Sequence, residues 1–92
     1  MTPTELADSL TDAQQEVLML MSDGEMVYPA SKIAAEAGFP LKETVKVLRH
    51  LRGIGVADRG PLWSDDDGLL RGSGTWLSPL GLEVRTILAS LR

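Results

Sequence analysis

Cysteine is absent from this sequence, and histidine occurs once, as His50. Without cysteine the chain can form neither a disulfide framework nor a thiolate zinc site, and a single histidine cannot build a metal site from imidazoles. The sequence also lacks a Gly-x-Ser-x-Gly nucleophile motif and a phosphate-binding glycine loop. We therefore expect a protein that is not an enzyme and that carries no cofactor or metal ion.

Long apolar runs are absent as well. The longest unbroken ones, such as Val17 to Met21, have about five residues, far fewer than the roughly 20 that a membrane helix needs. No lysine or arginine precedes Lys32, whereas a signal or transit peptide begins with basic residues. A chain of 92 residues has room for one modest core. These absences favour a single cytoplasmic domain, residues 1–92, that does not enter a membrane.

The net charge of −4 conceals an uneven distribution along the chain. Residues 1–31 contain six acidic side chains and no basic one, whereas residues 32–59 have a local balance of +3. One end of the domain is therefore acidic and the middle of the sequence is basic. This polarity could orient the molecule on DNA by electrostatic steering, and it could equally orient two protein partners head to tail.

Two capping boxes open the sequence, Thr2-Pro3-Thr4-Glu5 and Thr11-Asp12-Ala13-Gln14. In each box the threonine and the acid or amide three residues later satisfy free backbone amides at the start of a helix. The boxes predict a short helix over about residues 3–9 and a second helix over about residues 12–22, which Asp23-Gly24 would end.

A helix-turn-helix is expected over about residues 30–53. Its first helix runs through Ser31–Ala37, and Gly38 suits a left-handed residue at the end. Phe39-Pro40 forms the turn, because the residue before a proline is pushed out of helical space. Such a short connection lets two helices cross at a steep angle.

The second helix of this motif has an apolar side and a basic side. The apolar side repeats with the helical period and comprises Leu41, Val45 and Leu48, flanked by Thr44, Val47 and Leu51. The opposite side carries Lys42, Lys46 and Arg49, with Glu43 and His50 beside them and Arg52 at the end. A helix of this kind packs one side on a core and presents the other to a polyanion.

A hairpin is expected next, over about residues 56–77. Two extended segments, Val56–Trp63 and Leu69–Leu77, are joined by Ser64–Gly68, whose aspartates and glycine are typical of a turn. Pro61 and the Gly72–Gly74 insertion would interrupt regular pairing, so short, irregular strands are expected.

Three further expectations concern the surroundings of this hairpin. The stretch Met26–Tyr28 could pair with it, and Trp76 is expected to fill core beneath it, leaving Trp63 the more exposed tryptophan. A helix over about residues 79–91 should follow. Its apolar stripe either covers the core beside the helix at 12–22 or pairs with its twin in a homodimer. The stripe comprises Leu80, Val84, Ile87, Leu88 and Leu91.

In this order the segments resemble the winged helix-turn-helix transcription regulators of the MarR-like and ArsR-like groups, over roughly residues 11–90. The matching pieces are Ser31–Gly38, Val45–Leu51, Gly55-Val56 and Trp76–Gly81. The last piece is similar to an aromatic-x-Leu-Thr-x-x-Gly signature that closes the wing, with serine in place of threonine. The resemblance implies an α+β, mostly helical fold with a three-helix core, a two-stranded wing and a C-terminal helix.

The resemblance and the basic helix together predict sequence-specific binding to double-stranded DNA by a transcriptional regulator that acts as a homodimer. The base edges would be contacted by the residues nearest the helix start, and the phosphates by those further along. The first set is Lys42, Glu43 and Lys46, and the second is Arg49, His50 and Arg52.

Two alternatives stay open at this point. The charged helix side could be an ordinary solvated surface, because exposed charges are common on helices. The winged helix could also be a protein-interaction module that docks a basic partner. It would use its acidic N-terminal face or the wing tip Asp65-Asp66-Asp67, where wings that lie on DNA usually carry basic residues.

Overall fold

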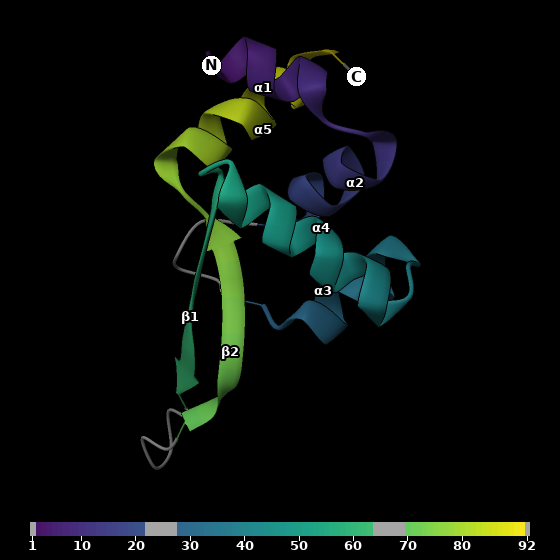
Figure 1. The fold of residues 1–92 in the computed structure, drawn as a ribbon, viewed down its shortest axis with the longest axis vertical. Coiled ribbons are helices and arrows are strands. Elements are labelled where there is room, and N and C mark those ends of the chain that lie inside the picture. Colours follow the sequence, from purple (N-terminus) through teal and green to yellow (C-terminus); the bar gives the residue numbers. More distant parts are fainter. Residues whose placement is uncertain (1, 22–27, 64–69, 92) are drawn as a thin grey trace.

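A computed structural model describes residues 2–21, 28–63 and 70–91, including the side chains of all but 61–63 and 70–73. These residues form five helices and one antiparallel hairpin. In chain order they are α1 (Pro3–Ser9), α2 (Asp12–Leu20), α3 (Ala30–Ala37), α4 (Leu41–Gly53), β1 (Ala57–Trp63), β2 (Leu70–Leu77) and α5 (Pro79–Leu91). The helices form a body from which the hairpin projects along the 42 Å long axis (Figure 1). No helix within these described ranges is long and apolar enough to cross a membrane.

Both predicted capping boxes are formed. The Thr2 hydroxyl accepts from the Glu5 amide at 3.2 Å, and the Thr2 amide donates to the Glu5 carboxylate at 3.3 Å. These hydrogen bonds hold the pKa of Glu5 below its usual range. The Thr11 and Gln14 pair makes the same two bonds at 3.2 and 2.9 Å.

Helix α1 has its predicted bounds, but α2 ends at Leu20, two residues before the predicted end. Met21 leaves the helix with extended backbone, and its carbonyl oxygen accepts from Arg85 Nη1 of α5 at 3.0 Å. A cation at this position also suits the negative end of the α2 dipole. The predicted Asp23-Gly24 stop lies outside the described residues.

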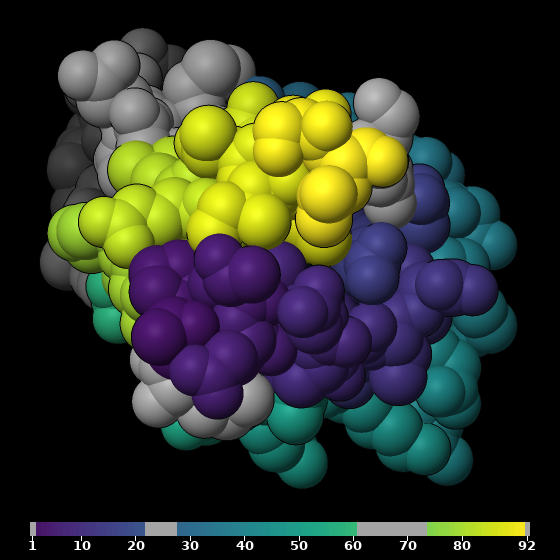
Figure 2. Space-filling view, turned by 90° about the horizontal axis from the view of Figure 1, so that it is seen from above, coloured from purple at the N-terminus to yellow at the C-terminus, as the bar shows by residue number. Residues whose placement is uncertain are grey.

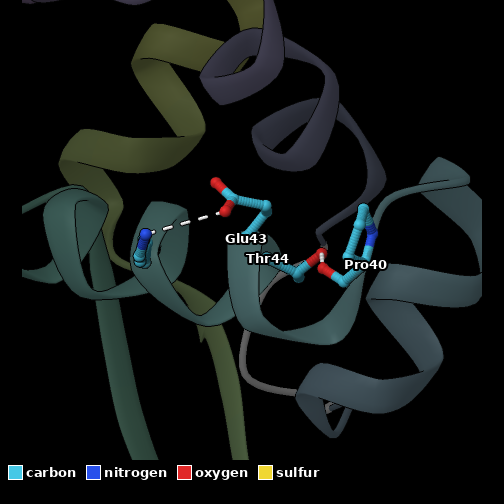
Figure 3. Close-up of polar contacts among 4 residues, drawn as sticks. Pro40, Glu43 and Thr44 are labelled. Carbon is cyan, nitrogen blue, oxygen red and sulfur yellow. Dashed lines mark hydrogen bonds and ion pairs between the residues drawn. The ribbon is translucent and has the colours of Figure 1, made fainter.

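The turn between α3 and α4 follows the prediction. Gly38 ends α3 with φ of 74°, a left-handed conformation, and α4 begins directly after Pro40. The Pro40 carbonyl accepts from the amide of Thr44 at 3.1 Å and from its hydroxyl at 3.3 Å (Figure 3). Thr44 can therefore be fully buried without losing hydrogen bonds.

The apolar side of α4 differs from the prediction at its first residue. Thr44, Leu48 and Leu51 are buried, whereas Leu41 is 52% exposed. Leu41 was expected on the apolar side and does lie in line with Leu48. Leu41 is the first residue of α4, and contact with the core begins only at Thr44, about one turn later. The expectation that Leu41 contributes to the core is wrong for this reason.

The core joins α4 to every other element of the body. It contains the buried face of α4, the inner residues of α1, α2, α3 and α5, and the base of the hairpin. Its apolar members are Leu6, Ala7, Leu10, Val17, Leu18, Met21, Ile33, Leu48, Leu51, Val56, Ala57, Leu77, Val84 and Leu88. Helix α4 is thus held on one side only, and its other side is left to the surface.

The hairpin pairs in a register that runs from Ala57 opposite Leu77 to Pro61 opposite Ser73. A shift between Pro61 and Trp63 confirms the predicted irregularity, although the strands keep nearly their whole predicted length. Tyr28 forms an isolated bridge with Thr75, which confirms the predicted pairing for that residue. Residues 26–27 and the predicted turn at 64–68 lie outside the described part of the chain.

The prediction that Trp76 fills the core is wrong. Successive strand residues point to opposite faces, and its neighbours Thr75 and Leu77 are the ones that are buried. Trp76 is only half-buried and lies over Gly60 of the partner strand, so close that a Cβ atom there would stand 2.5 Å from the ring. The side chain of Trp63 is not among those described.

The junction between the wing and α5 explains the Trp76–Gly81 motif. The Ser78 hydroxyl donates to the Gly55 carbonyl at 2.7 Å and accepts from the Gly81 amide at 3.1 Å, so it caps α5 and fixes the preceding turn. A Cβ atom on Gly81 would collide with the Val56 carbonyl oxygen. The hydroxyl and the glycine therefore let α5 approach the start of the wing closely.

Helices α1 and α5 lie side by side on the face shown in Figure 2. Val84 and Leu88 of α5 are buried in the core of the same chain, which settles the packing of the central part of its apolar stripe. Leu91, at the end of the helix, is 70% exposed.

Candidate nucleic-acid interface

The exposed side of α4 contains all six residues that the sequence pointed to. Five of them are exposed, and Arg52 is half-buried. Because an α-helix turns once in about 3.6 residues, the six residues fall on two adjoining stripes. Arg49 and Arg52 lie on the stripe toward the wing, Glu43, Lys46 and His50 lie on the outer stripe, and Lys42 lies between the two, next to both Lys46 and Arg49. The six side chains therefore form one continuous surface, with the two arginines at its wing-facing edge.

The outer stripe carries an ion pair. Glu43 Oε1 lies 3.6 Å from Lys46 Nζ, and both side chains are about 60% exposed (Figure 3). Exposed pairs of this kind contribute about 0 to 1 kcal/mol to stability. Both side chains can therefore change partner readily when a ligand approaches.

The wing-facing stripe borders a groove of about 250 Å³ between α4, the start of α3 and the hairpin. Arg49 and Arg52 enter it from α4, and Arg59 enters it from β1. The residues that line the groove are Ala30, Val45, Leu48, Arg49, Arg52, Arg59 and Thr75. His50 and Lys46 are not among them. Only the wing-facing arginines of the basic surface of α4 therefore line the groove, and the outer stripe lies outside it.

Arg59 is the functional candidate that the sequence reasoning missed. It follows the buried Ala57 by two residues on β1, so it points to the same side of the strand, toward α4. Its cross-strand partner is Thr75, which also lines the groove. The alternation along β1 was readable from the sequence, but which side of the strand packs on α4 was not.

The three arginines affect one another electrostatically. Partial burial lowers the pKa of Arg52, and the positive charges of Arg59 and Arg49 lower it further. Arginine nevertheless stays charged in proteins. The charges of Arg49 and Arg59 thus lie close enough to Arg52 to act on its guanidinium group.

Candidate metal ligands do not cluster in the described part of the chain. Within residues 2–21, 28–63 and 70–91 no three histidine, cysteine, aspartate or glutamate side chains are placed to hold a metal ion. The acidic segment Asp65–Asp67 lies outside these ranges.

The geometry defines a winged helix-turn-helix protein. Helix α4 follows α3 across a short turn, as the second helix of the motif does, and the hairpin β1–β2 is the wing beside it (Figure 1). The bridge between Tyr28 and Thr75 adds a one-residue pairing on the free side of β2. This architecture confirms the fold that the sequence predicted.

No protein-family model matches this sequence, and no curated protein is significantly similar to it. Among solved structures, the chain is similar to ZitR, a zinc-responsive MarR family member of Lactococcus lactis. The identity is 20% and the TM-score 0.71, over 89% of this chain and 53% of that chain. It is also similar to FabT of Streptococcus pneumoniae in complex with DNA, with 14% identity, a TM-score of 0.70 and coverage of 90% and 55%.

A third similar structure is the adhesin competence repressor AdcR of Streptococcus pyogenes. The identity is 16% and the TM-score 0.70, over 90% of this chain and 56% of that chain. The present chain spans about half the length of these proteins. The likeness establishes that its fold is the winged-helix fold of MarR-family regulators.

Proposed function

We infer that this protein is a transcriptional regulator that binds double-stranded DNA in a sequence-specific manner with α4 in the major groove. The observation that carries this proposal is the exposed basic side of α4, the second helix of a helix-turn-helix. That position is the one from which such motifs read base edges. The similarity in fold to FabT, whose structure is a complex with DNA, supports DNA binding by this fold.

The six residues of α4 take different roles in this proposal. Lys42, Glu43 and Lys46 lie in the first two turns, which is the end of a recognition helix that reaches base edges. Lysine donates to guanine, and glutamate accepts from the amino group of cytosine. Arg49, His50 and Arg52 lie further along and contact phosphates.

A pair of variants with equal net charge tests the proposal. Lys42→Ala/Lys46→Ala removes two positive charges from α4, whereas Thr4→Glu/Gln14→Glu adds two negative charges at the first turns of α1 and α2. Glutamate suits both positions, because it complements the helix dipole and keeps the capping box at Gln14. Binding of each variant to a generic duplex is measured by fluorescence anisotropy at several salt concentrations.

We expect the α4 variant to lose tenfold or more in affinity at low salt, since phosphate neutralisation dominates nonspecific binding. The control should stay within about threefold of the unmodified protein, because its added charges lie on α1 and α2 and not on the exposed side of α4. Equal losses in both variants would contradict a local interface. An absence of binding by the unmodified protein would turn attention to a basic protein partner for the acidic side chains of α1 and α2.

Assembly and location complete the proposal. A cytoplasmic homodimer would present two α4 helices to half-sites about one DNA turn apart, which suits a palindromic operator. The exposed Leu91 at the end of α5 offers apolar surface for such contact. Sedimentation equilibrium across a concentration series tests this point, and a mass of one chain at every concentration would overturn it.

A further inference from the structure

The arginine groove has a composition that suits an oxyanion. Its three guanidinium groups come from two elements, Arg49 and Arg52 from α4 and Arg59 from β1. Among the described residues that line it, none carries a carboxylate. Asp58, the nearest acid along β1, follows the buried Ala57 by one residue and so points to the opposite side of the strand.

The electrostatics of the groove favour an anion as well. Burial lowers the pKa of Arg52, and the positive charges of Arg59 and Arg49 lower it further, so both charges repel the charged form of Arg52. An anion among them would relieve this repulsion. Val45 and Leu48 supply an apolar wall, which reduces solvent screening of the charges. Guanidinium groups also match phosphate geometry, since they can donate two parallel hydrogen bonds.

The N-terminus of α3 adds to the positive electrostatic potential of the groove. Its first residue, Ala30, lines the groove, and its N-cap is Pro29, which provides no side-chain hydrogen bond to the free amides of the first turn. The positive end of the α3 dipole therefore lies at the edge of the groove. The aromatic ring of Tyr28 beside it holds Lys32 Nζ at 4.3 Å from its centroid.

The position of the groove identifies which anion it would hold. In B-DNA a phosphate backbone separates the major groove, about 12 Å wide, from the minor groove, about 6 Å wide. With α4 in the major groove and the wing against the adjacent minor groove, that backbone must pass between α4 and the wing. The arginine groove of the protein lies at this same place, between α4 and the wing.

We propose that Arg49, Arg52 and Arg59 form a seat for one backbone phosphate of duplex DNA, which sets the register of the protein on the duplex without reading a base. This proposal rests on the DNA-binding function inferred above and assigns Arg59 a role in it. It assigns the wing-facing arginines to positioning and leaves Lys42, Glu43 and Lys46, in the first two turns of α4, free to read sequence.

The test uses Arg59→Ala, since Arg59 is exposed and its replacement should leave the fold intact. Gln14→Glu changes the net charge by the same amount at a distant site and is the matched control. Affinity for several duplexes of unrelated sequence is measured against salt concentration, and melting temperature is measured for each variant. In parallel, the Nε–H signals of the arginines are followed by NMR during titration with a duplex and with inorganic phosphate at equal ionic strength.

We expect Arg59→Ala to weaken binding roughly tenfold for every duplex and to reduce the salt slope by about 1, as for the loss of one phosphate contact. Arg59→Lys should restore the salt slope, because the slope depends on the number of positive charges at the interface. It should not restore the full affinity, because lysine lacks the planar guanidinium group that donates two parallel hydrogen bonds. The duplex should shift the Arg52 and Arg59 signals to saturation, and inorganic phosphate should not.

Two results would overturn the seat. One is an Arg59→Ala variant that matches Gln14→Glu in affinity and slope while Lys42→Ala/Lys46→Ala still loses binding, which leaves the DNA-binding function intact. The other is saturation of the arginine signals by inorganic phosphate with unchanged duplex binding by Arg59→Ala, which would assign the groove to a free anion. A protein that binds no duplex at all would instead contradict the function itself.

Discussion

The two sides of α4 differ in their surroundings. The inner side, with Thr44, Leu48 and Leu51, is closed off by partners from α2, the wing and the rest of the core. The outer side is largely exposed and carries the charged side chains. Changes on the inner side should therefore act on stability, and changes on the outer side should act on binding with little effect on stability. The following predictions test this division, in order of decreasing effect.

The largest effect is expected from Leu51→Ala. Leu51 is fully buried, and removing its side chain should lower the free energy of unfolding by about 2–5 kcal/mol through lost burial and the remaining cavity. Lys46→Ala on the other side should change it by less than about 0.5 kcal/mol. Urea denaturation followed by circular dichroism measures both. Similar destabilisation by the two variants would contradict the division.

A smaller effect is expected from Gly81→Ala, which extends the comparison to the junction that supports α4. Its Cβ would meet the Val56 carbonyl, which is backbone and cannot move aside, so we expect a loss of about 1–3 kcal/mol. Gly53→Ala at the end of α4 is the control, because a Cβ there meets nothing within 4 Å. Alanine should be neutral or stabilising at that helical position. Thermal melting of the two variants checks the difference, and a Gly81→Ala protein as stable as Gly53→Ala would refute the close approach.

Thr44→Val tests the one polar residue on the inner side of α4. Valine fills the same space but loses the hydroxyl that donates to the Pro40 carbonyl. That carbonyl still accepts from the backbone amide of residue 44, so no buried group is left without a partner. We expect a loss of no more than about 1 kcal/mol in urea denaturation. A loss as large as that of Leu51→Ala would mean that the turn between α3 and α4 depends on the hydroxyl.

The sequence allowed the elements to be predicted where the signal is local. Three such signals depend only on residues within one or two turns. They are the capping boxes at Thr2 and Thr11, the left-handed conformation of Gly38 and the helical period of apolar residues in α4. Local patterns also identified the charged residues of α4, because a helix orders its faces by sequence spacing alone.

Predictions that depended on contacts between distant segments were less successful. Trp76 was assigned to the wrong face of the wing, since the alternation of a strand does not say which face meets the core. Arg59 was missed for the same reason. The need for glycine at position 81 follows from its approach to Val56, which no local pattern encodes. A candidate site that joins a helix to a strand is thus visible only once the two are placed together.

The smallest effect on stability should come from Glu43→Gln, and this variant separates the two sides of α4 most sharply. Its ion pair with Lys46 is exposed and contributes less than about 0.5 kcal/mol, so urea denaturation should hardly change. Binding to a generic duplex should become several-fold tighter, because a negative charge leaves the interface and Lys46 is free to neutralise a phosphate. Asp8→Gln on α1 is the control, since it removes one exposed negative charge far from α4. Equal gains in affinity from Glu43→Gln and Asp8→Gln would mean that total charge, and not the outer side of α4, governs binding. A gain confined to Glu43→Gln would place the charge that opposes DNA on α4 itself, as the proposed recognition helix requires, since a glutamate that repels phosphate can still select for cytosine.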